Sequence, residues 1–233
     1  MISIIIPTYN EAGNITALIN KICLNLKQQD YEIIVVDDDS PDKTWQIVQA
    51  LSRENKRVKL IRRLNQKGLT SAYNQGISQS RGEIVGWLDA DLSHPPALLT
   101  KMLAFLPKFD AIVASRYVTG GRDSRQELLA VKLSRIINRL AQLCLYPDFT
   151  DYTSGYILVK KSYLKNIVLR GDYGEYFIEL IFRLKQAGAK IKEIGYVNIS
   201  RTRGDSKTAT NWFGFFRRGI KYIITLLTLW LKK

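Results

Sequence analysis

Short apolar runs alternate with amphipathic segments over the first 116 residues, and no other feature of the sequence constrains the fold as strongly. Each run is long enough for one buried strand, and the segments between the runs have helical periodicity. Strands that alternate with helices form βα units, whose strands lie parallel in one sheet. The pattern predicts strands at Ile2–Pro7, Glu32–Asp38, Val58–Arg62, Glu83–Asp89 and Ala111–Arg116. It predicts the intervening helices near Asn14–Gln28, Lys43–Glu54, Leu69–Ser80 and Pro95–Leu106.

The second half of the chain is less regular and begins with a Gly120-Gly121 break. Residues 201–210 are polar and have the composition of a loop. No repeat or low-complexity linker interrupts the sequence, so we expect one continuous α/β domain with a mostly parallel sheet. The further elements expected are a helix over Gln126–Leu145, a strand over Gly155–Lys160, a helix over Tyr176–Gln186, a strand over Ile191–Ser200 and a final helix over Asn211–Leu231.

Charge is distributed unevenly along the 233 residues, whose formal net charge is +14. Residues 1–50 hold three Lys or Arg against seven Asp or Glu, whereas residues 201–233 hold eight against one. The acidic end suits a cation or hydroxyl groups, and the basic end suits an anion such as a phosphorylated substrate or a membrane surface. The two cysteines, Cys23 and Cys144, lie in apolar stretches and are expected as small buried side chains. The first residues do not have the pattern of a signal peptide, which favours a cytoplasmic protein.

The final helix bears on membrane contact. Arg217, Arg218 and Lys221 interrupt its apolar sequence, and the ten residues after Lys221 would extend only about 15 Å, against roughly 30 Å for a hydrocarbon core. The helix is therefore expected to lie in a membrane interface rather than to span it. Two alternatives stay open: it docks on the domain's own core, or on a second copy of the chain in a homo-oligomer. The aromatic residues that suit an interface are Trp212, Phe213, Phe215 and Phe216.

Chemically reactive side chains gather where the predicted strands end, which is where doubly wound sheets bind ligands. Asp89 and Asp91 follow the fourth predicted strand, and two carboxylates at this spacing can bind one hard cation that keeps positions open for phosphate oxygens. Three aspartates, Asp37–Asp39, follow the second strand, and we expect one of them to accept a hydrogen bond from a base or ribose. No GxxxxGK[ST] or GxGxxG loop occurs. The single histidine, His94, is interpreted as structural rather than catalytic.

These motifs resemble those of family-2 glycosyltransferases with the GT-A fold, and more narrowly those of dolichol-phosphate and polyprenyl-phosphate mannose synthases. The resemblance extends to about residue 210. The segments that carry it are Pro-Thr-Tyr-Asn-Glu (7–11), Val-Asp-Asp-Asp-Ser-Pro-Asp (36–42), Lys-Gly-Leu (67–69), Asp-Ala-Asp-Leu-Ser-His-Pro-Pro (89–96), Ser-Arg-Tyr-Val (115–118), Asp-Tyr-Thr-Ser-Gly (151–155) and Arg-Thr-Arg-Gly-Asp-Ser-Lys (201–207).

The resemblance implies a metal-dependent, inverting transfer of mannose from GDP-mannose to a polyprenyl phosphate, with Mg²⁺ or Mn²⁺ as cofactor. It implies a Rossmann-like catalytic domain over 1–210 and a basic amphipathic helix over 211–233, peripheral at the cytoplasmic face of a membrane. By the same resemblance, Asp89 and Asp91 hold the metal, and the catalytic residues are Asp91, Arg116, Arg201 and Lys207. The residues expected to bind the nucleotide sugar are Pro7, Tyr9, Glu11, Val36, Asp38, Asp89, Ala90, Asp91, Arg116, Arg201 and Lys207.

Two positions depart from the family pattern. Ser93 stands where the family usually has glutamine, which leaves a third metal ligand unassigned. Ala130 stands where the family tends to have an arginine that contacts the acceptor phosphate, and three cations are candidates to replace it: Arg125, Lys132 and Arg135. We also expect residues 201–207 to close over the site when an anionic donor binds.

Other functions are weighed against this one. The donor could be UDP-glucose or another nucleotide sugar, or the acceptor a saccharide hydroxyl, in which case Asp151 or Glu175 would serve as the base. A sugar-nucleotide pyrophosphorylase would need a glycine-rich loop after the first strand, and none is present. The acidic strand ends oppose a nucleic-acid-binding module, so no nucleic acid is expected as a partner.

Overall fold

The computed structural model of the chain describes residues 1–171, 173–200 and 212–233. Seven strands form the main sheet, in the order β3-β2-β1-β4-β7-β5-β8. Its strands are β1 (Ile2–Thr8), β2 (Tyr31–Asp37), β3 (Val58–Arg62), β4 (Ile84–Trp87), β5 (Ala111–Ser115), β7 (Ile157–Lys160) and β8 (Ile191–Gly195). The helices are α1 (Ile15–Asn25), α2 (Thr44–Glu54), α3 (Leu69–Gln79), α4 (Leu98–Leu103), α5 (Leu128–Cys144), α6 (Glu175–Gln186) and α7 (Trp212–Trp230), with a short 3₁₀ helix, η1, at Lys161–Leu164.

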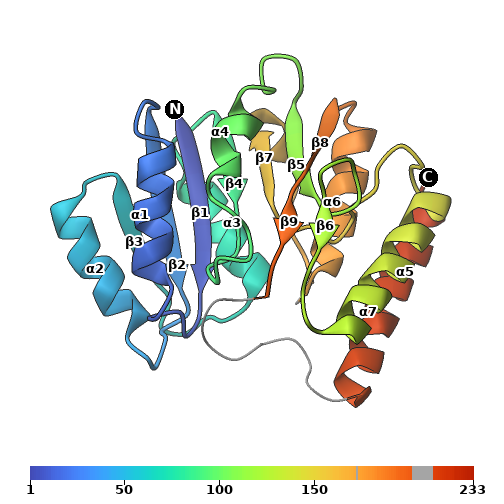
Figure 1. The fold of residues 1–233 in the computed structure, drawn as a ribbon, viewed down its shortest axis with the longest axis horizontal. Helices are drawn as coiled ribbons and strands as arrows, with labels where there is room; N and C mark the ends of the chain where they lie inside the picture. The colour runs from blue at the N-terminus through green and yellow to red at the C-terminus, as the bar shows by residue number, and fades with distance from the viewer. Residues whose placement is uncertain (172, 201–211) are drawn as a thin grey trace.

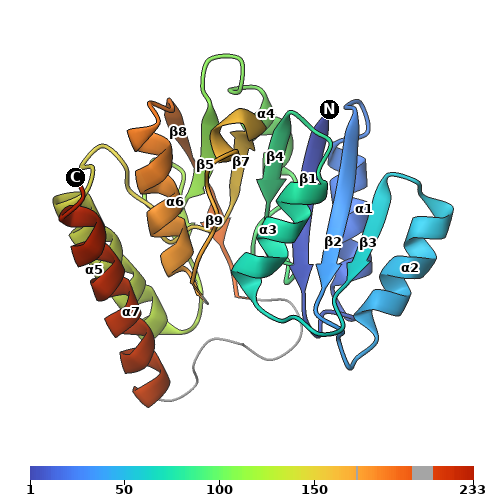
Figure 2. The same cartoon turned by 180° about the vertical axis from the view of Figure 1, so that it is seen from behind.

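Helices cover both faces of the sheet, and two hydrophobic clusters result (Figures 1 and 2). One cluster joins β1 and β2 to α1, α2 and α4; the other joins the opposite face of the sheet to α3, α5, α6 and α7. Every residue of β2 is buried, which explains why it reads as one continuous apolar run rather than an alternating one. The predicted α/β fold with a mostly parallel sheet is confirmed.

The order of strands in the main sheet does not follow their order in the sequence. β7 lies between β4 and β5 and is antiparallel to both, so the end of β5 is not adjacent to the end of β4. The strand expected over 191–200 is also not continuous. It leaves the main sheet after Gly195, where an added Cβ would lie 2.3 Å from the Thr119 carbonyl oxygen. The chain then forms β9 (Val197–Asn198), which pairs with β6 (Arg122–Asp123) in a second, two-stranded sheet that the sequence did not predict.

Helix α4 is shorter than predicted. It begins at Leu98, so Pro95 and Pro96 lie in the turn before the helix and not in its first turn. The carbonyl groups of these prolines accept hydrogen bonds from the backbone N–H groups of Leu98 and Leu99, at 3.0 and 3.1 Å. This is the tighter spacing of a 3₁₀ turn, which precedes many α-helices.

Helices α5 and α7 lie side by side at the β8 end of the molecule (Figures 1 and 2). Leu226 and Leu229 of α7 are buried in the cluster that contains α5 and α6, so this helix docks on the domain's own core. Within the described residues, no helix is long and apolar enough to cross a membrane. The side chains of residues 212–218, which include the expected interfacial aromatics, Arg217 and Arg218, lie outside the described part.

Candidate active site

A cavity of about 920 Å³ opens at the carboxyl ends of β1, β2 and β4. Its walls come from the loops after these strands, from the loop before α3, from α5, and from residues 219–223 of α7. Eight of the residues expected to bind donor or metal line it: Pro7, Tyr9, Glu11, Asp38, Asp89, Ala90, Asp91 and Arg116. Arg201 and Lys207 lie outside the described residues. The structure therefore brings the predicted site residues that it describes to one place, except Val36.

Val36 is fully buried in the sheet and does not line the cavity, so its expected contact with a nucleoside stays a prediction. The three aspartates after β2 differ in their surroundings. Asp37 is buried and accepts hydrogen bonds from the Thr8 and Ser40 hydroxyl groups, both at 2.7 Å. Asp39 forms an ion pair with Arg62, on the surface. Asp38 is the one of the three that lines the cavity.

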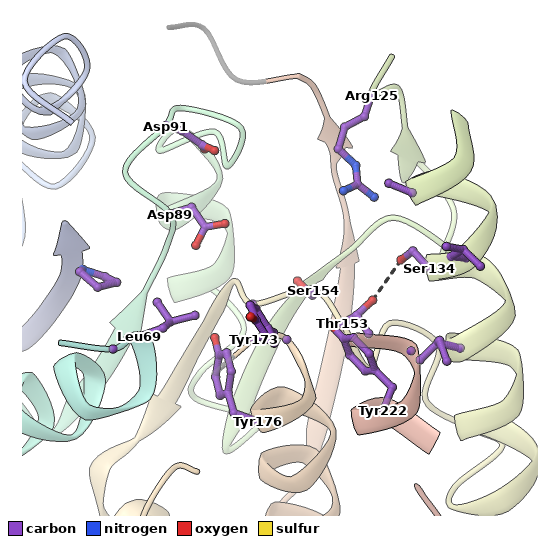
Figure 3. A pocket seen from close by; sticks show the side chains of 18 of the residues that line it. Leu69, Asp89, Asp91, Arg125, Ser134, Thr153, Ser154, Tyr173, Tyr176 and Tyr222 are labelled. Atoms are coloured by element: carbon purple, nitrogen blue, oxygen red, sulfur yellow. Dashed lines mark hydrogen bonds between the residues drawn. The ribbon is translucent and has the colours of Figure 1, made fainter. Parts of the chain in front are cut away.

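Asp38 is held in place by the segment that precedes α3. The Arg63 guanidinium, which is almost fully buried, donates to Asp38 Oδ1, and the Gly68 N–H donates to Asp38 Oδ2 at 2.8 Å. Arg63 also donates to the Gly68 carbonyl at 2.9 Å. One carboxylate thus fixes the Lys67-Gly68-Leu69 segment at the cavity wall, and Leu69 is visible there in Figure 3.

The Asp89 and Asp91 side chains both lie at the cavity wall, in the loop that follows β4 (Figure 3). Leu92 has a φ of 66°, so the chain turns sharply between Asp91 and Ser93. The Ser93 N–H donates to Asp91 Oδ1 at 3.0 Å, and Ser93 itself is buried away from the cavity. His94 is also buried and does not line the cavity.

The donor set fits a hard divalent cation. No group of three or more His, Cys, Asp or Glu that could hold a metal occurs in the part of the chain that the structure describes. Two carboxylates alone leave most of the coordination positions of Mg²⁺ or Mn²⁺ open to water and phosphate oxygens. This is the arrangement required if the ion binds together with a diphosphate rather than in a closed protein cage.

Arg116 is the centre of a buried ion network at the end of β5. Its Nε donates to Asp151 Oδ2 at 2.8 Å and its Nη2 to Asp151 Oδ1 at 2.6 Å, while Nη1 lies 3.3 Å from Asp123 Oδ2. Burial by itself lowers the pKa of Arg116, but the Asp151 charge outweighs it and raises that pKa well above the ordinary value. Two carboxylates thus occupy much of the guanidinium, and its expected contact with a phosphate stays a prediction.

Arg125 is the cation that sequence reasoning could not separate from Lys132 and Arg135. The structure places Arg125 at the cavity wall, whereas Lys132 and Arg135 are exposed on α5 and do not line it. Asp123 orients the Arg125 guanidinium through contacts of 2.8 Å to Nε and 2.7 Å to Nη2. Ser134 lines the same wall, hydrogen-bonded to Thr153 at 3.2 Å (Figure 3).

The apolar half of the cavity was missed in the sequence. It is a groove between α5 and α7, lined by Leu133, Ile136, Ile137, Leu140, Ile220 and Ile223. The signal was present, because α5 carries more apolar residues than one buried face of a helix needs. Tyr173, Tyr176 and Tyr222 lie between this groove and the carboxylates (Figure 3).

The two carboxylates considered as a base for a hydroxyl acceptor do not reach the cavity. Asp151 is fully buried against Arg116, and Glu175 is buried at the start of α6. Neither is among the described residues that line the cavity. The geometry therefore gives no support to the reading in which either residue activates a saccharide hydroxyl.

Comparisons with known proteins identify the family of the chain. The family model described as glycosyl transferase family 2 matches residues 3–168. A dolichol-phosphate mannosyltransferase of Pyrococcus furiosus is 35% identical over 88% of this chain, which spans 58% of that relative's length. A dolichol-phosphate mannosyltransferase of Saccharomyces cerevisiae is 28% identical, with 98% of this chain and 92% of the relative covered. An undecaprenyl-phosphate mannosyltransferase of Micrococcus luteus is 29% identical, with 87% and 85% covered.

Among solved structures, glucosyl-3-phosphoglycerate synthase from Mycobacterium tuberculosis, in complex with Mn²⁺, uridine diphosphate and phosphoglyceric acid, is similar with a TM-score of 0.74. The alignment covers 99% of this chain and 78% of that chain at 16% identity, so it shows a shared fold alone. The family match covers more than half of the sequence and includes the loop that contains Asp89 and Asp91. The chain belongs to glycosyl transferase family 2, as its motifs predicted.

Proposed function

We propose that this protein transfers mannose from GDP-mannose to the phosphate of a polyprenyl lipid, with inversion at the anomeric carbon. The observation that carries the proposal is the order of chemical groups along one cavity. Paired carboxylates lie at one end, a guanidinium and hydroxyl groups in the middle, and an apolar groove at the other end. The curated relatives, named for mannosyl transfer to dolichol phosphate and undecaprenyl phosphate, support the same donor sugar and acceptor class.

The carboxylate end suits the nucleotide diphosphate. Asp89 and Asp91 would hold Mg²⁺ or Mn²⁺, which supplies Lewis-acid stabilisation of the charge on the departing diphosphate. Pro7, Tyr9, Glu11 and Asp38 line the adjoining wall, where the nucleoside would lie. Asp89 and Asp91 by themselves would repel a diphosphate, so removal of the divalent ion is expected to abolish donor binding.

The middle of the cavity suits the acceptor phosphate. Arg125 is fixed by Asp123 and presents a planar guanidinium, which matches phosphate oxygens better than a flexible ammonium does. Ser134 adds a hydroxyl group on the same wall. A phosphate monoester already carries about −1.5 to −2 charges near neutral pH, so its oxygen can attack the anomeric carbon without a general base. This requirement agrees with a site in which Asp151 and Glu175 are buried away from the cavity.

The apolar end suits the polyprenyl chain and a membrane. Leu133, Ile136 and Leu140 line the groove and remain 37%, 55% and 39% exposed, so the groove opens onto the surface. We define the α5–α7 surface as the exposed apolar side chains of the two helices. These are Leu128, Leu129, Leu133, Ile136, Leu140 and Leu143 of α5, and Ile220, Ile223, Ile224, Leu227 and Trp230 of α7.

Three exposed cations, Lys132, Arg135 and Arg139, lie on α5 beside these apolar residues. A basic, apolar helix pair of this kind suits an anionic membrane surface, where each cation gains about 1 kcal/mol. Membrane contact therefore involves α5 as well as the terminal helix from which the sequence predicted it. The location at the cytoplasmic face and the oligomeric state stay predictions.

A transfer assay tests the proposal. Labelled GDP-mannose, or UDP-glucose in a parallel reaction, is incubated with a polyprenyl phosphate with and without Mg²⁺ or Mn²⁺, and label is measured in the organic phase. We expect metal-dependent transfer from GDP-mannose, with a loss of at least about 100-fold for Asp91→Asn. Asp30→Asn is the matched control, because Asp30 is 80% exposed and does not line the cavity. Metal-independent transfer, or near-normal turnover of Asp91→Asn, would contradict the assignment.

The acceptor role of Arg125 has its own readout. Arg125→Ala is expected to raise KM for the lipid phosphate by roughly 10-fold or more while KM for the donor is unchanged, because a charge-assisted contact worth about 1.5–3 kcal/mol is lost. Arg53→Ala is the matched control, since Arg53 is an exposed arginine on α2 that neither lines the cavity nor belongs to the basic face of α5. Equal acceptor KM values for the two variants would show that Arg125 does not bind the acceptor phosphate.

A further inference from the structure

We propose that His94 is a positioning residue for the donor site, because it fixes the peptide from which the Asp89 carboxylate projects. The inference rests on the proposed function, in which Asp89 and Asp91 hold a metal-bound diphosphate. His94 does not line the cavity and therefore acts through Asp89 rather than on the substrate.

The peptide of Asp89 lies just beyond the sheet. The pairing of β4 with β1 ends at Trp87, opposite Ile5, and the pairing of β4 with β7 also ends at Trp87, opposite Ile157. The Asp89 N–H therefore has no ladder partner on either side. It donates instead to His94 Nδ1, at 3.1 Å. A side chain thus takes the place of the sheet as the hydrogen-bond partner of this backbone group.

The imidazole is itself held rigidly. His94 is 3% exposed, and its ring stacks on Tyr156 with centroids 5.1 Å apart and planes 20° apart. Tyr196 packs edge-on against the same ring, with centroids 5.7 Å apart. Tyr156 also donates through its hydroxyl group to the Pro95 carbonyl, at 3.2 Å. The two tyrosines therefore hold the plane of the ring, in which Nδ1 faces the Asp89 N–H.

The two carboxylates of the loop are thus positioned by different means. Asp91 is fixed at its side chain, where Oδ1 accepts from the Ser93 N–H. For Asp89, the bond to His94 joins the first residue of a six-residue turn to the last, and Leu92, at a φ of 66°, lies between them. Loss of that bond would remove a restraint on the Asp89 peptide, from which the carboxylate projects toward the cavity. Outer contacts of this kind typically change metal affinity or activity by about 10- to 100-fold.

Two substitutions separate the hydrogen bond from the packing. His94→Phe keeps a ring between Tyr156 and Tyr196 but removes the acceptor, whereas His94→Asn keeps an acceptor close to the position of Nδ1 and removes the ring. Tyr156→Phe is the control, because it removes the hydroxyl bond to Pro95 but leaves the Asp89 N–H bonded. GDP affinity is measured by calorimetry with and without Mn²⁺, free Mn²⁺ by electron paramagnetic resonance, and kcat and KM in the transfer assay.

We expect His94→Phe to bind GDP about 10-fold more weakly in the presence of Mn²⁺ and equally without it, with kcat lowered as well. His94→Asn is expected to recover most of both quantities, and Tyr156→Phe to resemble the wild type. A His94→Phe protein that binds Mn²⁺ and GDP as the wild type does would overturn the inference, and so would a His94→Asn protein as weak as His94→Phe.

Two further results keep the tests distinct. If GDP binding to the wild type does not depend on Mn²⁺, the metal role of Asp89 and Asp91 fails, and the proposed function fails with it. If His94→Phe does not fold, hydrogen exchange at the Asp89 N–H decides the matter. Protection in the wild type and in His94→Asn is expected, and rapid exchange in the wild type shows that His94 does not hold this peptide.

Discussion

Replacing three apolar side chains of the α5–α7 surface by serine is expected to release the protein from membranes without unfolding it. Leu143, Ile224 and Leu227 are 70%, 57% and 53% exposed, and none of them lines the cavity. Burial of a whole side chain of this size contributes about 1.5–3 kcal/mol, so at these exposures each contributes about 1 kcal/mol on entering a membrane interface. The triple variant should lose about 3 kcal/mol, a roughly 100-fold lower vesicle partition coefficient.

Sedimentation with vesicles of neutral and of anionic lipids measures the partition coefficient. The matched control is a second triple serine variant at Leu24, Leu64 and Val168, which are 66%, 61% and 58% exposed on other parts of the molecule. We expect the control to bind as the wild type does, and salt to weaken wild-type binding to anionic vesicles. Both variants should keep the wild-type unfolding temperature and act normally on a short, water-soluble acceptor.

Two results would refute the membrane assignment. One is a triple variant of the α5–α7 surface that binds vesicles as tightly as the control variant does. The other is a wild-type dimer that dissociates in this variant, measured by light scattering, with no change in vesicle binding, since the surface would then contact a second copy of the chain. Point substitution is preferable to removal of the whole terminal helix, because Leu226 and Leu229 belong to the core and their loss would unfold the protein.

Three further predictions concern stability. Burial raises the pKa of Glu32, but hydrogen bonds from Lys59, the Arg81 N–H and Ser3 outweigh it and lower the pKa to about 2 from 4.5. Glu32→Gln should therefore lower the free energy of unfolding by about 3 kcal/mol near neutral pH. The difference in this free energy between the variant and the wild type should shrink by about 2 kcal/mol by pH 3, and urea unfolding between pH 7 and pH 3 measures it. Gly86→Ala should destabilise the protein by about 1–3 kcal/mol, because the new Cβ would lie 2.2 Å from Leu158 Cδ2. Gly219→Ala is the control and should not destabilise the protein, because its new Cβ would have no atom within 4 Å. Thermal unfolding compares the two variants. Asp151→Ala should cost about 3–5 kcal/mol in the same assay, because it removes the closer of the two carboxylates that pair with the buried Arg116.

The parts of the fold that could be predicted are those that local pattern determines. β1 and β2 are buried on both faces, so their apolar runs stand out from the amphipathic segments around them. The order of strands could not be obtained in this way. β7 follows α5 in the chain and inserts between β4 and β5. The residues of β7 do not indicate with which strands it pairs. β6 and β9 have two residues each, too few for any periodicity.

In the candidate site, too, the residues that local sequence determines could be predicted, and those that depend on tertiary structure could not. Asp89 and Asp91 could be predicted because both carboxylates come from one short segment of sequence. Arg125 could not be chosen over Lys132, because it lies at the cavity wall through the fold of the segment after β6, which pairs with the distant β9. The proposed positioning role of His94 could not be predicted from the sequence either. A lone buried histidine is usually a packing residue. His94 differs from such a residue because it accepts a hydrogen bond from the Asp89 N–H.

The position of the groove bears on how a lipid acceptor could reach the carboxylates. Each isoprenoid unit adds five carbons, and its transfer from a bilayer into water would cost roughly 3–4 kcal/mol. Binding a long tail through water is therefore prohibitive, and the cavity must open where the tail already lies. The groove meets this condition, since Ile136 and Leu140 of α5 and Ile220 and Ile223 of α7 line the cavity and are also exposed on the α5–α7 surface. In the proposed function, one pair of helices thus forms both the membrane-facing surface and the acceptor wall, and only the phosphate has to travel inward, toward Arg125.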